Sequence, residues 1–238
     1  MKKLLTAGLL ALLWLHPTPV SAESVTLTMT GSGLTNVLGG FYVGPYTVQG
    51  ANGNLFKVIC DDFFADTYIG ESWTATVSNF SNLDSAKFHG VTDSATKYNQ
   101  VAWLATQLLS PPSSCNGGNC AGDIQFALWQ VFGGTAPAAY LTGVDVTNAA
   151  SWLSASYNAV TAPNFNAGQF ANYLIYTPTT CISGCNGSLP QEFIKVVLPV
   201  MGLPQPVPEA PTLALVGAGL VVGFASSGRR RTWRKKLF

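Results

Sequence analysis

Residues 94–109 read Ser-Ala-Thr-Lys-Tyr-Asn-Gln-Val-Ala-Trp-Leu-Ala-Thr-Gln-Leu-Leu, and here the pattern of the chain changes from strand to helix. Apolar residues recur three or four positions apart, which predicts a helix over 95–109 with Ser94 as its N-cap. Pro111 and Pro112 end this helix. Its buried side is expected to contain Tyr98, Val101, Ala102, Ala105, Leu108 and Leu109.

Before this stretch the chain alternates apolar and polar residues, which is typical of β-strands. We predict strands at 24–30, 41–48, 55–60 and 73–80. The Gly-Ala-Asn-Gly sequence at 50–53 predicts a hairpin connection between the second and third of them.

After this stretch we predict a helix over 123–132, ended by Gly133 and Gly134, and a helix over 149–160 that Asn148 caps. Residues 169–175 are ambiguous, and 193–200 form an apolar closing strand. The fold class is therefore α+β, with an antiparallel β-rich N-terminal half, a three-helix middle and a closing strand.

The N-terminus has the pattern of a secretory signal. Lys2 and Lys3 precede an apolar run at 4–15, and Val20-Ser21-Ala22 supplies small residues at the spacing that signal peptidase recognises. We predict a signal peptide over 1–22, cleaved after Ala22.

The C-terminal segment, 204–238, has three parts. A proline-rich motif at 204–211 stays extended, an uncharged apolar run at 212–228 predicts a single short transmembrane helix, and the basic end at 229–238 stays in the cytoplasm. An ordinary tail anchor is one explanation of this order.

The same order resembles the PEP-CTERM sorting signal of bacterial envelope proteins. The matching residues are Val207, Pro208, Glu209, Pro211, Arg229, Arg230 and Arg231, whereas Ala210 stands where the family usually has proline. The resemblance implies export through the inner membrane and a membrane-anchored precursor with a transient span. An exosortase-type protease would then process it, leaving the product at the cell surface or in the extracellular matrix.

The exported body, 23–203, has the length of one domain. Four lysines and ten acidic residues lie in it, so its formal charge is 4 − 10 = −6 although the whole chain has +1. This charge excludes the basic surface that nucleic-acid binding requires.

Five cysteines remain after the signal is removed. Cys115 and Cys120, and likewise Cys181 and Cys185, close short loops rich in glycine, asparagine and serine. Two spaced pairs are also compatible with zinc, but an oxidising compartment favours disulfides, and we predict no metal. Local pairing leaves Cys60 unpaired.

Two motifs suggest a chemistry for Cys60. They are Ile59-Cys60-Asp61-Asp62 and the later Ile124-Gln125-Phe126-Ala127-Leu128-Trp129. Over about 41–133 they resemble the thioester domains of Gram-positive surface adhesins, although an acid follows the cysteine where an apolar residue is usual.

The resemblance implies a bond between the Cys60 sulfur and the side-chain carbonyl of Gln125, with release of ammonia. Asp61 or Asp62 would orient donors or move a proton, and Trp129 completes the motif. An acyl thioester is captured by amines. The protein would then attach once to an amine-bearing surface, with no turnover and no cofactor, and would not be an enzyme.

Alternatives remain open from the sequence. Cys60 is compatible with an inert buried side chain in a structural protein of an extracellular polysaccharide matrix. A carbohydrate groove is compatible with six aromatic residues: Tyr42, Tyr46, Trp73, Trp103, Trp129 and Trp152. Asp61, Asp62 and Asp66 suggest a calcium site but lack its usual loop spacing. His89 beside Gly90 is typical of a loop.

Overall fold

The computed structural model describes residues 23–32, 37–111 and 119–197. The predicted signal peptide, the sorting segment 204–238 with its transmembrane helix, and Cys115 lie outside these residues. The chain divides into two compact units after Val197, and every described residue belongs to the first.

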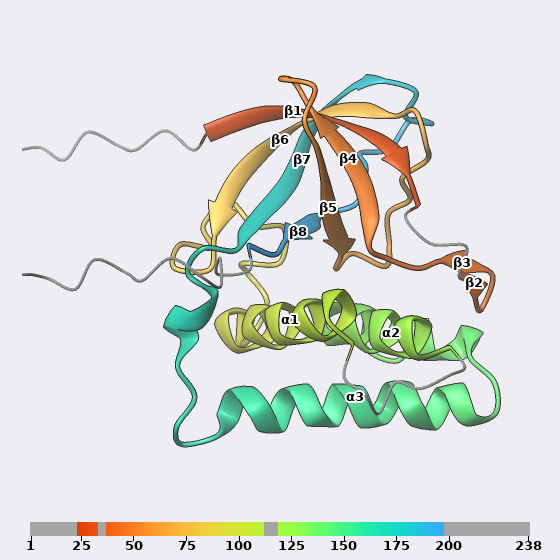
Figure 1. Ribbon diagram of the computed structural model, residues 1–238, viewed down its shortest axis with the longest axis vertical. Coiled ribbons are helices and arrows are strands. Elements are labelled where there is room, and N and C mark those ends of the chain that lie inside the picture. Colours follow the sequence, from red (N-terminus) through yellow and green to blue (C-terminus); the bar gives the residue numbers. More distant parts are fainter. Residues whose placement is uncertain (1–22, 33–36, 112–118, 198–238) are drawn as a thin grey trace, which may run out of the picture. The chain divides into compact units, whose positions relative to one another are not determined.

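Six antiparallel strands form a closed barrel in the order β1-β4-β5-β8-β7-β6 (Figure 1). Their bounds are β1 Glu23–Gly31, β4 Tyr46–Gly50, β5 Leu55–Cys60, β6 Ser72–Asn79, β7 Leu174–Ser183 and β8 Phe193–Lys195. A separate two-stranded sheet pairs β2 Val37–Leu38 with β3 Phe41–Tyr42. The barrel interior is apolar, and Trp73 stacks there on Phe193 with ring centroids 5.8 Å apart.

The strand predictions at 24–30, 55–60 and 73–80 are confirmed, and so is the turn at 50–53, where Gly53 N–H donates to the Gly50 carbonyl. The single strand predicted at 41–48 is wrong. It is divided into β3 and β4 because the chain leaves the ladder at Gly44–Pro45, where proline has no N–H to donate.

The C-terminal part of the barrel also differs from the prediction. Of the closing strand predicted at 193–200, β8 contains only Phe193–Lys195; residues 196 and 197 lie outside the strand, and 198–200 are not among the described residues. The ten-residue β7 was not predicted, since Pro178 and a run of threonines obscure its apolar alternation.

The described part of the chain contains three α-helices: α1 Ser94–Leu109, α2 Cys120–Gly133 and α3 Val144–Thr161. Two short 3-10 turns, η1 Pro137–Tyr140 and η2 Ala167–Phe170, follow α2 and α3. Gly134 ends α2 with a positive φ of 60°, as its position predicts. The α+β fold class is thereby confirmed.

Both predicted N-caps are wrong. The residue before α1 is Asp93, and its side chain makes no capping hydrogen bond. Asn148 lies inside α3, which begins four residues earlier, at Val144. Its side chain instead donates to the Asp123 carboxyl at 2.9 Å and thereby joins α3 to α2.

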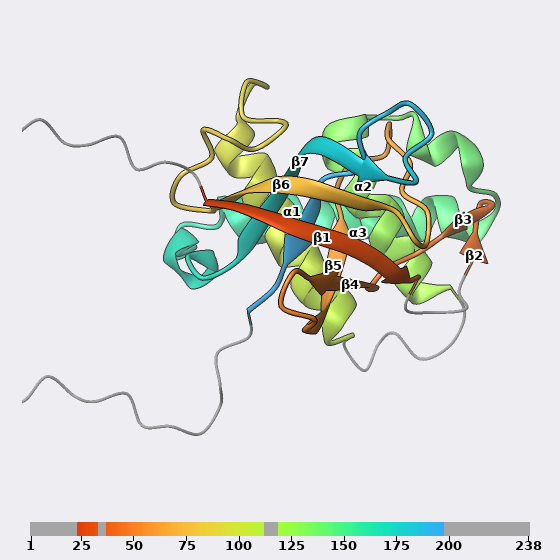
Figure 2. The same cartoon turned by 90° about the horizontal axis from the view of Figure 1, so that it is seen from above.

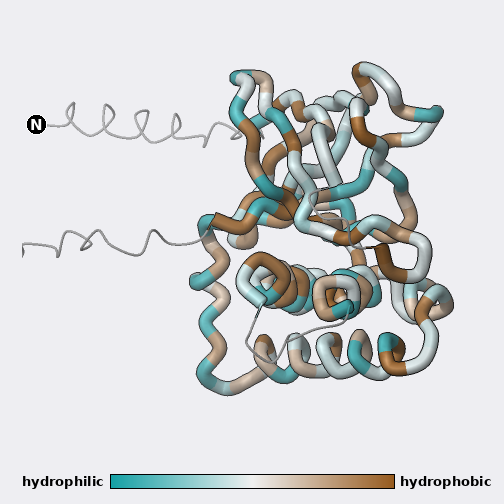
Figure 3. The backbone as a smooth tube through the Cα atoms, turned by 45° about the vertical axis from the view of Figure 1, so that its right-hand side comes forward, coloured by the Kyte–Doolittle hydropathy of each residue, from teal (hydrophilic) through white to brown (hydrophobic). Residues whose placement is uncertain are grey.

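The barrel and the helices form stacked layers. α1 and α2 lie side by side under one end of the barrel, and α3 lies beneath them (Figure 1). Seen from above, β1, β6 and β7 cross over α1 (Figure 2). The tube coloured by hydropathy shows apolar stretches in the strands and in the first helix pair, while α3 alternates polar and apolar residues (Figure 3). Accordingly only Ala149, Ser156 and Val160 of α3 are buried.

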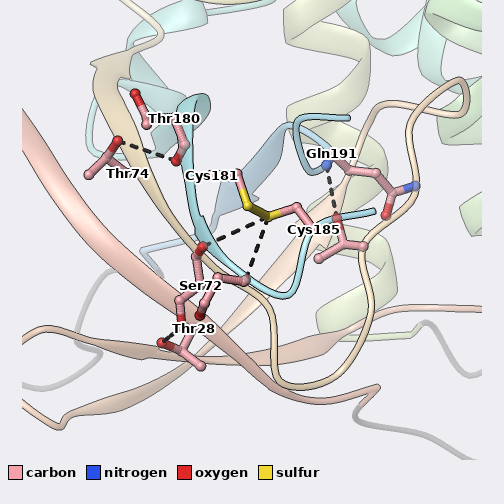
Figure 4. Close-up of a disulfide and its surroundings, with 9 residues drawn as sticks. Thr28, Ser72, Thr74, Thr180, Cys181, Cys185 and Gln191 are labelled. Atoms are coloured by element: carbon pink, nitrogen blue, oxygen red, sulfur yellow. Dashed lines mark hydrogen bonds between the residues drawn. A yellow bond between two sulfur atoms is a disulfide. The ribbon is translucent and has the colours of Figure 1, made fainter. Parts of the chain in front are cut away.

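The local disulfide between Cys181 and Cys185 is confirmed. It joins the end of β7 to the following loop, beside the start of β6 (Figure 4). There the Ser72 hydroxyl is hydrogen-bonded to Thr28 of β1 at 2.7 Å. Cys120 is also disulfide-bonded, but its predicted partner Cys115 is not among the described residues.

None of the helices in the described ranges is both long and apolar enough to cross a membrane.

Gly122 determines how closely α2 approaches β2. A Cβ at this position would lie 2.6 Å from Leu38 Cδ2 and 2.9 Å from Leu38 Cβ. We expect Gly122→Ala to lower the free energy of unfolding by about 1–2 kcal/mol, because the clash exceeds the gain in helix propensity of about 1 kcal/mol. Urea unfolding measures the change.

Two variants serve as controls for this prediction. Gly90→Ala, where an added Cβ meets nothing within 4 Å, should leave stability within about 0.5 kcal/mol. Combining Gly122→Ala with Leu38→Ala should cost less than the sum of the two single changes. Strictly additive losses would contradict the proposed contact.

Candidate functional site: a buried cysteine and glutamine

Cys60 and Gln125 lie together where the barrel meets the first helical layer. Cys60 is the last residue of β5, and Gln125 lies in the second turn of α2. Both have an exposed fraction of 0%. Cys60 is free, as predicted, whereas the other cysteines within the described ranges are bonded.

The Gln125 carboxamide is held at both ends. Its Nε2 donates to the backbone carbonyl of Cys60 at 2.7 Å, and its Oε1 accepts from the backbone N–H of Gly44 at 3.2 Å. Only this orientation of the amide satisfies both backbone groups, because one is an acceptor and the other a donor. The carbonyl carbon of Gln125 is therefore fixed beside Cys60.

The Cys60 sulfur is also held from two sides. The Trp129 indole N–H donates to Sγ at 3.4 Å, and the thiol donates to the Asp62 carbonyl at 3.2 Å. Gln125 and Trp129 are four residues apart, so both side chains project from the same face of α2.

Burial raises the pKa of the Cys60 thiol well above its usual range. The nearby Asp62 and Asp61 carboxyls raise this pKa further, while the Trp129 hydrogen bond opposes the rise. At neutral pH the residue is a thiol, and its reaction requires a group that takes the proton.

Asp61 and Glu192 are two buried carboxyls with different surroundings. Glu192 accepts from the Lys87 backbone N–H at 2.7 Å, from the Tyr98 hydroxyl at 2.6 Å and from Thr177. Among the described residues no donor reaches either oxygen of Asp61, whose carboxyl interacts with that of Glu192.

Burial raises the pKa of Asp61 well above its usual range, and the Glu192 and Asp62 carboxyls add to the rise. Burial also raises the pKa of Glu192, but its three donors oppose this. Asp61 is therefore the protonated member of the pair, and it follows Cys60 directly in the sequence. Different environments assign such paired carboxyls to acid and base roles.

Asp62 has a structural part in this site. Its carboxylate forms an ion pair with Lys87 and accepts from the Phe64 N–H at 3.1 Å. Its backbone carbonyl accepts from Gln191 Nε2 at 2.9 Å as well as from the Cys60 thiol. Asp62 thus fixes the turn that follows β5.

Aromatic rings close one side of the site. Phe41 lies against Trp129 with centroids 5.8 Å apart and against Tyr140 at 5.0 Å. Phe63 lies against the same two rings at 5.6 and 5.7 Å. This packing excludes water from Trp129 and from the Cys60 sulfur behind it.

The arrangement suits acyl transfer between the two side chains. The Gly44 N–H is aimed at the oxygen on which charge develops when a thiol attacks an amide. In such a reaction the departing nitrogen would be Nε2, which the Cys60 carbonyl holds. Groups oriented for an intramolecular reaction gain an effective molarity of roughly 10⁵–10⁸ M at best.

The other residues considered from the sequence are not brought together. Asp66 is exposed while Asp61 and Asp62 are buried, and the described residues contain no group of three or more His, Cys, Asp and Glu side chains placed for a metal. His89 lies in a turn, where its Nδ1 is 2.8 Å from the Ala86 carbonyl.

The aromatic residues proposed for a carbohydrate groove are scattered. Trp73 lies inside the barrel and Trp129 in the candidate site, both buried. Trp103 and Trp152 pack on each other between α1 and α3, with centroids 6.1 Å apart. Tyr42 and Tyr46 instead line a shared pocket, together with other side chains.

Sequence reasoning missed Gly44 and Glu192. A Cβ at Gly44 would lie 2.8 Å from Gln125 Oε1, so this position must be glycine for the amide to fit. The Gly44-Pro45 pair, which interrupts a predicted strand, was the available signal. Glu192 is a lone acid beside an apolar run, and no motif marks it.

Comparison with protein-family models, with curated proteins and with solved structures finds no match to this chain.

Protonated Asp61 makes stability depend on pH. Because its pKa is raised in the folded protein, the folded state binds more protons than the unfolded state, and stability falls as pH rises above about 4. We expect Asp61→Asn to flatten this fall and to be more stable than the wild type at pH 8. Urea unfolding at a series of pH values measures both.

Asp66→Asn is the matched control, since it removes an exposed carboxyl from the same loop. It should retain the slope of the wild type. A slope that Asp61→Asn leaves unchanged would contradict a protonated Asp61 in the folded protein.

Proposed function

We propose that this chain is an exported bacterial surface protein that forms an internal thioester between Cys60 and Gln125 and uses it to attach covalently to amines. It reacts once per molecule and carries out no turnover. The resemblance of its two motifs to adhesin thioester domains first suggested this activity.

The meeting of a free cysteine with the Gln125 amide carries the proposal. Oε1 and Nε2 are each hydrogen-bonded, one to the Gly44 N–H and one to the Cys60 carbonyl, in a site of 0% exposure. A glutamine that only filled the core would satisfy its amide equally well. The supporting observation is that the free cysteine and a donor to its sulfur, Trp129, meet at this same amide.

The reaction balances within the site. The Cys60 sulfur attacks Gln125 Cδ, the Cδ–Nε2 bond breaks, and the thiol proton leaves with the nitrogen as ammonia. An incoming amine then attacks Cδ, the S–Cδ bond breaks, and the sulfur regains a proton. The product is an amide between Gln125 and the amine, with a free Cys60 thiol.

Sorting forms the second part of the proposal. The signal peptide at 1–22 and the PEP-CTERM-like segment at 204–238 support export, transient membrane insertion and processing by an exosortase-type protease. Covalent attachment is useful to a protein that is placed at the cell surface or in the matrix, where amine-bearing partners occur.

Intact mass tests the thioester directly. We expect the body, 23–203, produced in an oxidising compartment, to be lighter than its disulfide-bonded sequence by one ammonia. Methylamine should convert it to the plain mass plus one methylene and release one titratable thiol. Peptide mapping should place the methylamine on Gln125.

Variants with and without the two reacting side chains show whether the mass changes come from Cys60 and Gln125. Cys60→Ser and Gln125→Glu should each abolish the ammonia loss and the methylamine addition. Gln130→Glu, on the same helix outside the site, should keep both. A wild-type mass equal to the plain sequence with a titratable thiol would refute the thioester and leave a structural matrix component.

Sorting is tested in the full chain in a host that has an exosortase-type system. Replacing Pro208 and Glu209 by alanine should leave unprocessed precursor in the membrane fraction, whereas Gln205→Ala should be processed normally. Fractionation and immunoblotting measure the two forms. Normal processing of the Pro208/Glu209 variant would contradict the sorting assignment.

A further inference from the structure

The buried position of the reactive pair raises the question of how an amine reaches it. Cys60 and Gln125 are fully buried, so a partner must enter past a side chain that also borders open space. Two sides of the site differ in this respect. The side of Phe41 and Phe63 is closed by rings in contact with Trp129, and the side of Tyr46 borders a pocket.

This pocket has a volume of about 210 Å³. All of its lining residues are uncharged. Three are tyrosines, Tyr42, Tyr46 and Tyr68, and the others are Met29, Ser32, Thr67 and Ile69. Since one water occupies about 30 Å³ of liquid, the space corresponds to roughly seven waters, enough for an unbranched aliphatic chain of several carbons.

Tyr46 belongs both to this pocket and to the reactive site. An added Cβ at Gly44 would lie 2.8 Å from Gln125 Oε1 and 3.3 Å from Tyr46 Cε2. The Gln125 amide and the Tyr46 ring therefore both lie next to Gly44. Burial raises the pKa of Tyr46, and the nearby Cys60 sulfur adds to the rise. The Tyr46 hydroxyl donates to the Tyr42 carbonyl at 2.7 Å, which holds the ring between pocket and site.

On the basis of the proposed function, we infer that the pocket of Tyr42, Tyr46 and Tyr68 receives the attacking amine. The Tyr46 ring separates this pocket from Gln125, and the amine moves past it to reach the thioester. The substrate class is a primary amine at the end of an unbranched aliphatic stem.

The chemistry of the lining suits both the binding of the protonated amine and the loss of its proton. Tyrosine faces attract an ammonium group, and an uncharged pocket of low polarity favours its loss of a proton. The neutral amine is the form that attacks a thioester. The apolar stem then packs on Met29 and Ile69 while the nitrogen approaches Gln125.

The test compares a short and a long amine on the body that has lost ammonia. Tyr68→Ala should slow the reaction with n-pentylamine about fivefold more than the reaction with methylamine, because only the longer amine has an apolar stem that packs on the ring. Intact mass over time gives both rates.

Tyr140→Ala is the matched control. Tyr140 is 52% exposed and Tyr68 is 54% exposed, and Tyr140 lies on the closed aromatic side of the site. It should leave the ratio of the two rates as in the wild type. Both tyrosines are largely exposed, so neither substitution is expected to unfold the protein.

The outcomes separate the two proposals. If Tyr68→Ala forms the thioester but keeps the wild-type ratio of the n-pentylamine rate to the methylamine rate, the inference about the pocket is wrong and the thioester proposal remains. If Tyr140→Ala lowers this ratio instead, the amine enters from the side of Phe41 and Phe63, and the inference about the pocket is likewise wrong. A wild-type chain without ammonia loss would remove the proposed function, and this inference with it.

Discussion

The carboxamide of Gln125 is the interaction on which the junction of barrel and helices depends. It joins α2 to the end of β5 and to the Gly44 backbone through two hydrogen bonds in a dry environment. Such bonds are worth more where water cannot replace them, and an unmade one there costs more. The fold therefore holds the Gln125 amide beside Cys60 as part of its own packing, and no separate element is needed to maintain this arrangement.

A second buried polar group ties distant segments together near the same place. Glu192, just before β8, accepts hydrogen bonds from the segment before α1, from α1 itself and from β7. Its own backbone carbonyl lies 3.4 Å from the Asp61 nitrogen. The residue thus orders the surroundings of the Cys60–Asp61 turn, and its charge adds to the burial that raises the pKa of Asp61.

The sequence predicted the parts of this protein that local pattern determines. Strand alternation in β1, β5 and β6 and the helical spacing of α1 were readable. Cys60 and Gln125, which the two motifs pair, lie in contact. Tertiary contacts decided the rest. Asn148 looked like a cap but serves as a hydrogen-bond donor between helices, β7 lacks clear alternation, and Gly44 and Glu192 acquire their roles only from segments far away in the chain. A closed barrel could not be inferred while one of its six strands was unrecognised.

Barrel closure has a consequence for a chain that is poor in charge and rich in threonine. An open sheet leaves a row of unpaired N–H and C=O groups along each outer strand, and these groups template pairing with neighbouring molecules. Here β1 pairs with both β4 and β6, so the sheet returns to its first strand. Closure is narrowest at the three-residue β8, which pairs with only Ile59 and Cys60 of β5 and with only the first three residues of β7. Closure thus removes most of the free edge through which molecules crowded at high local concentration would join strand to strand.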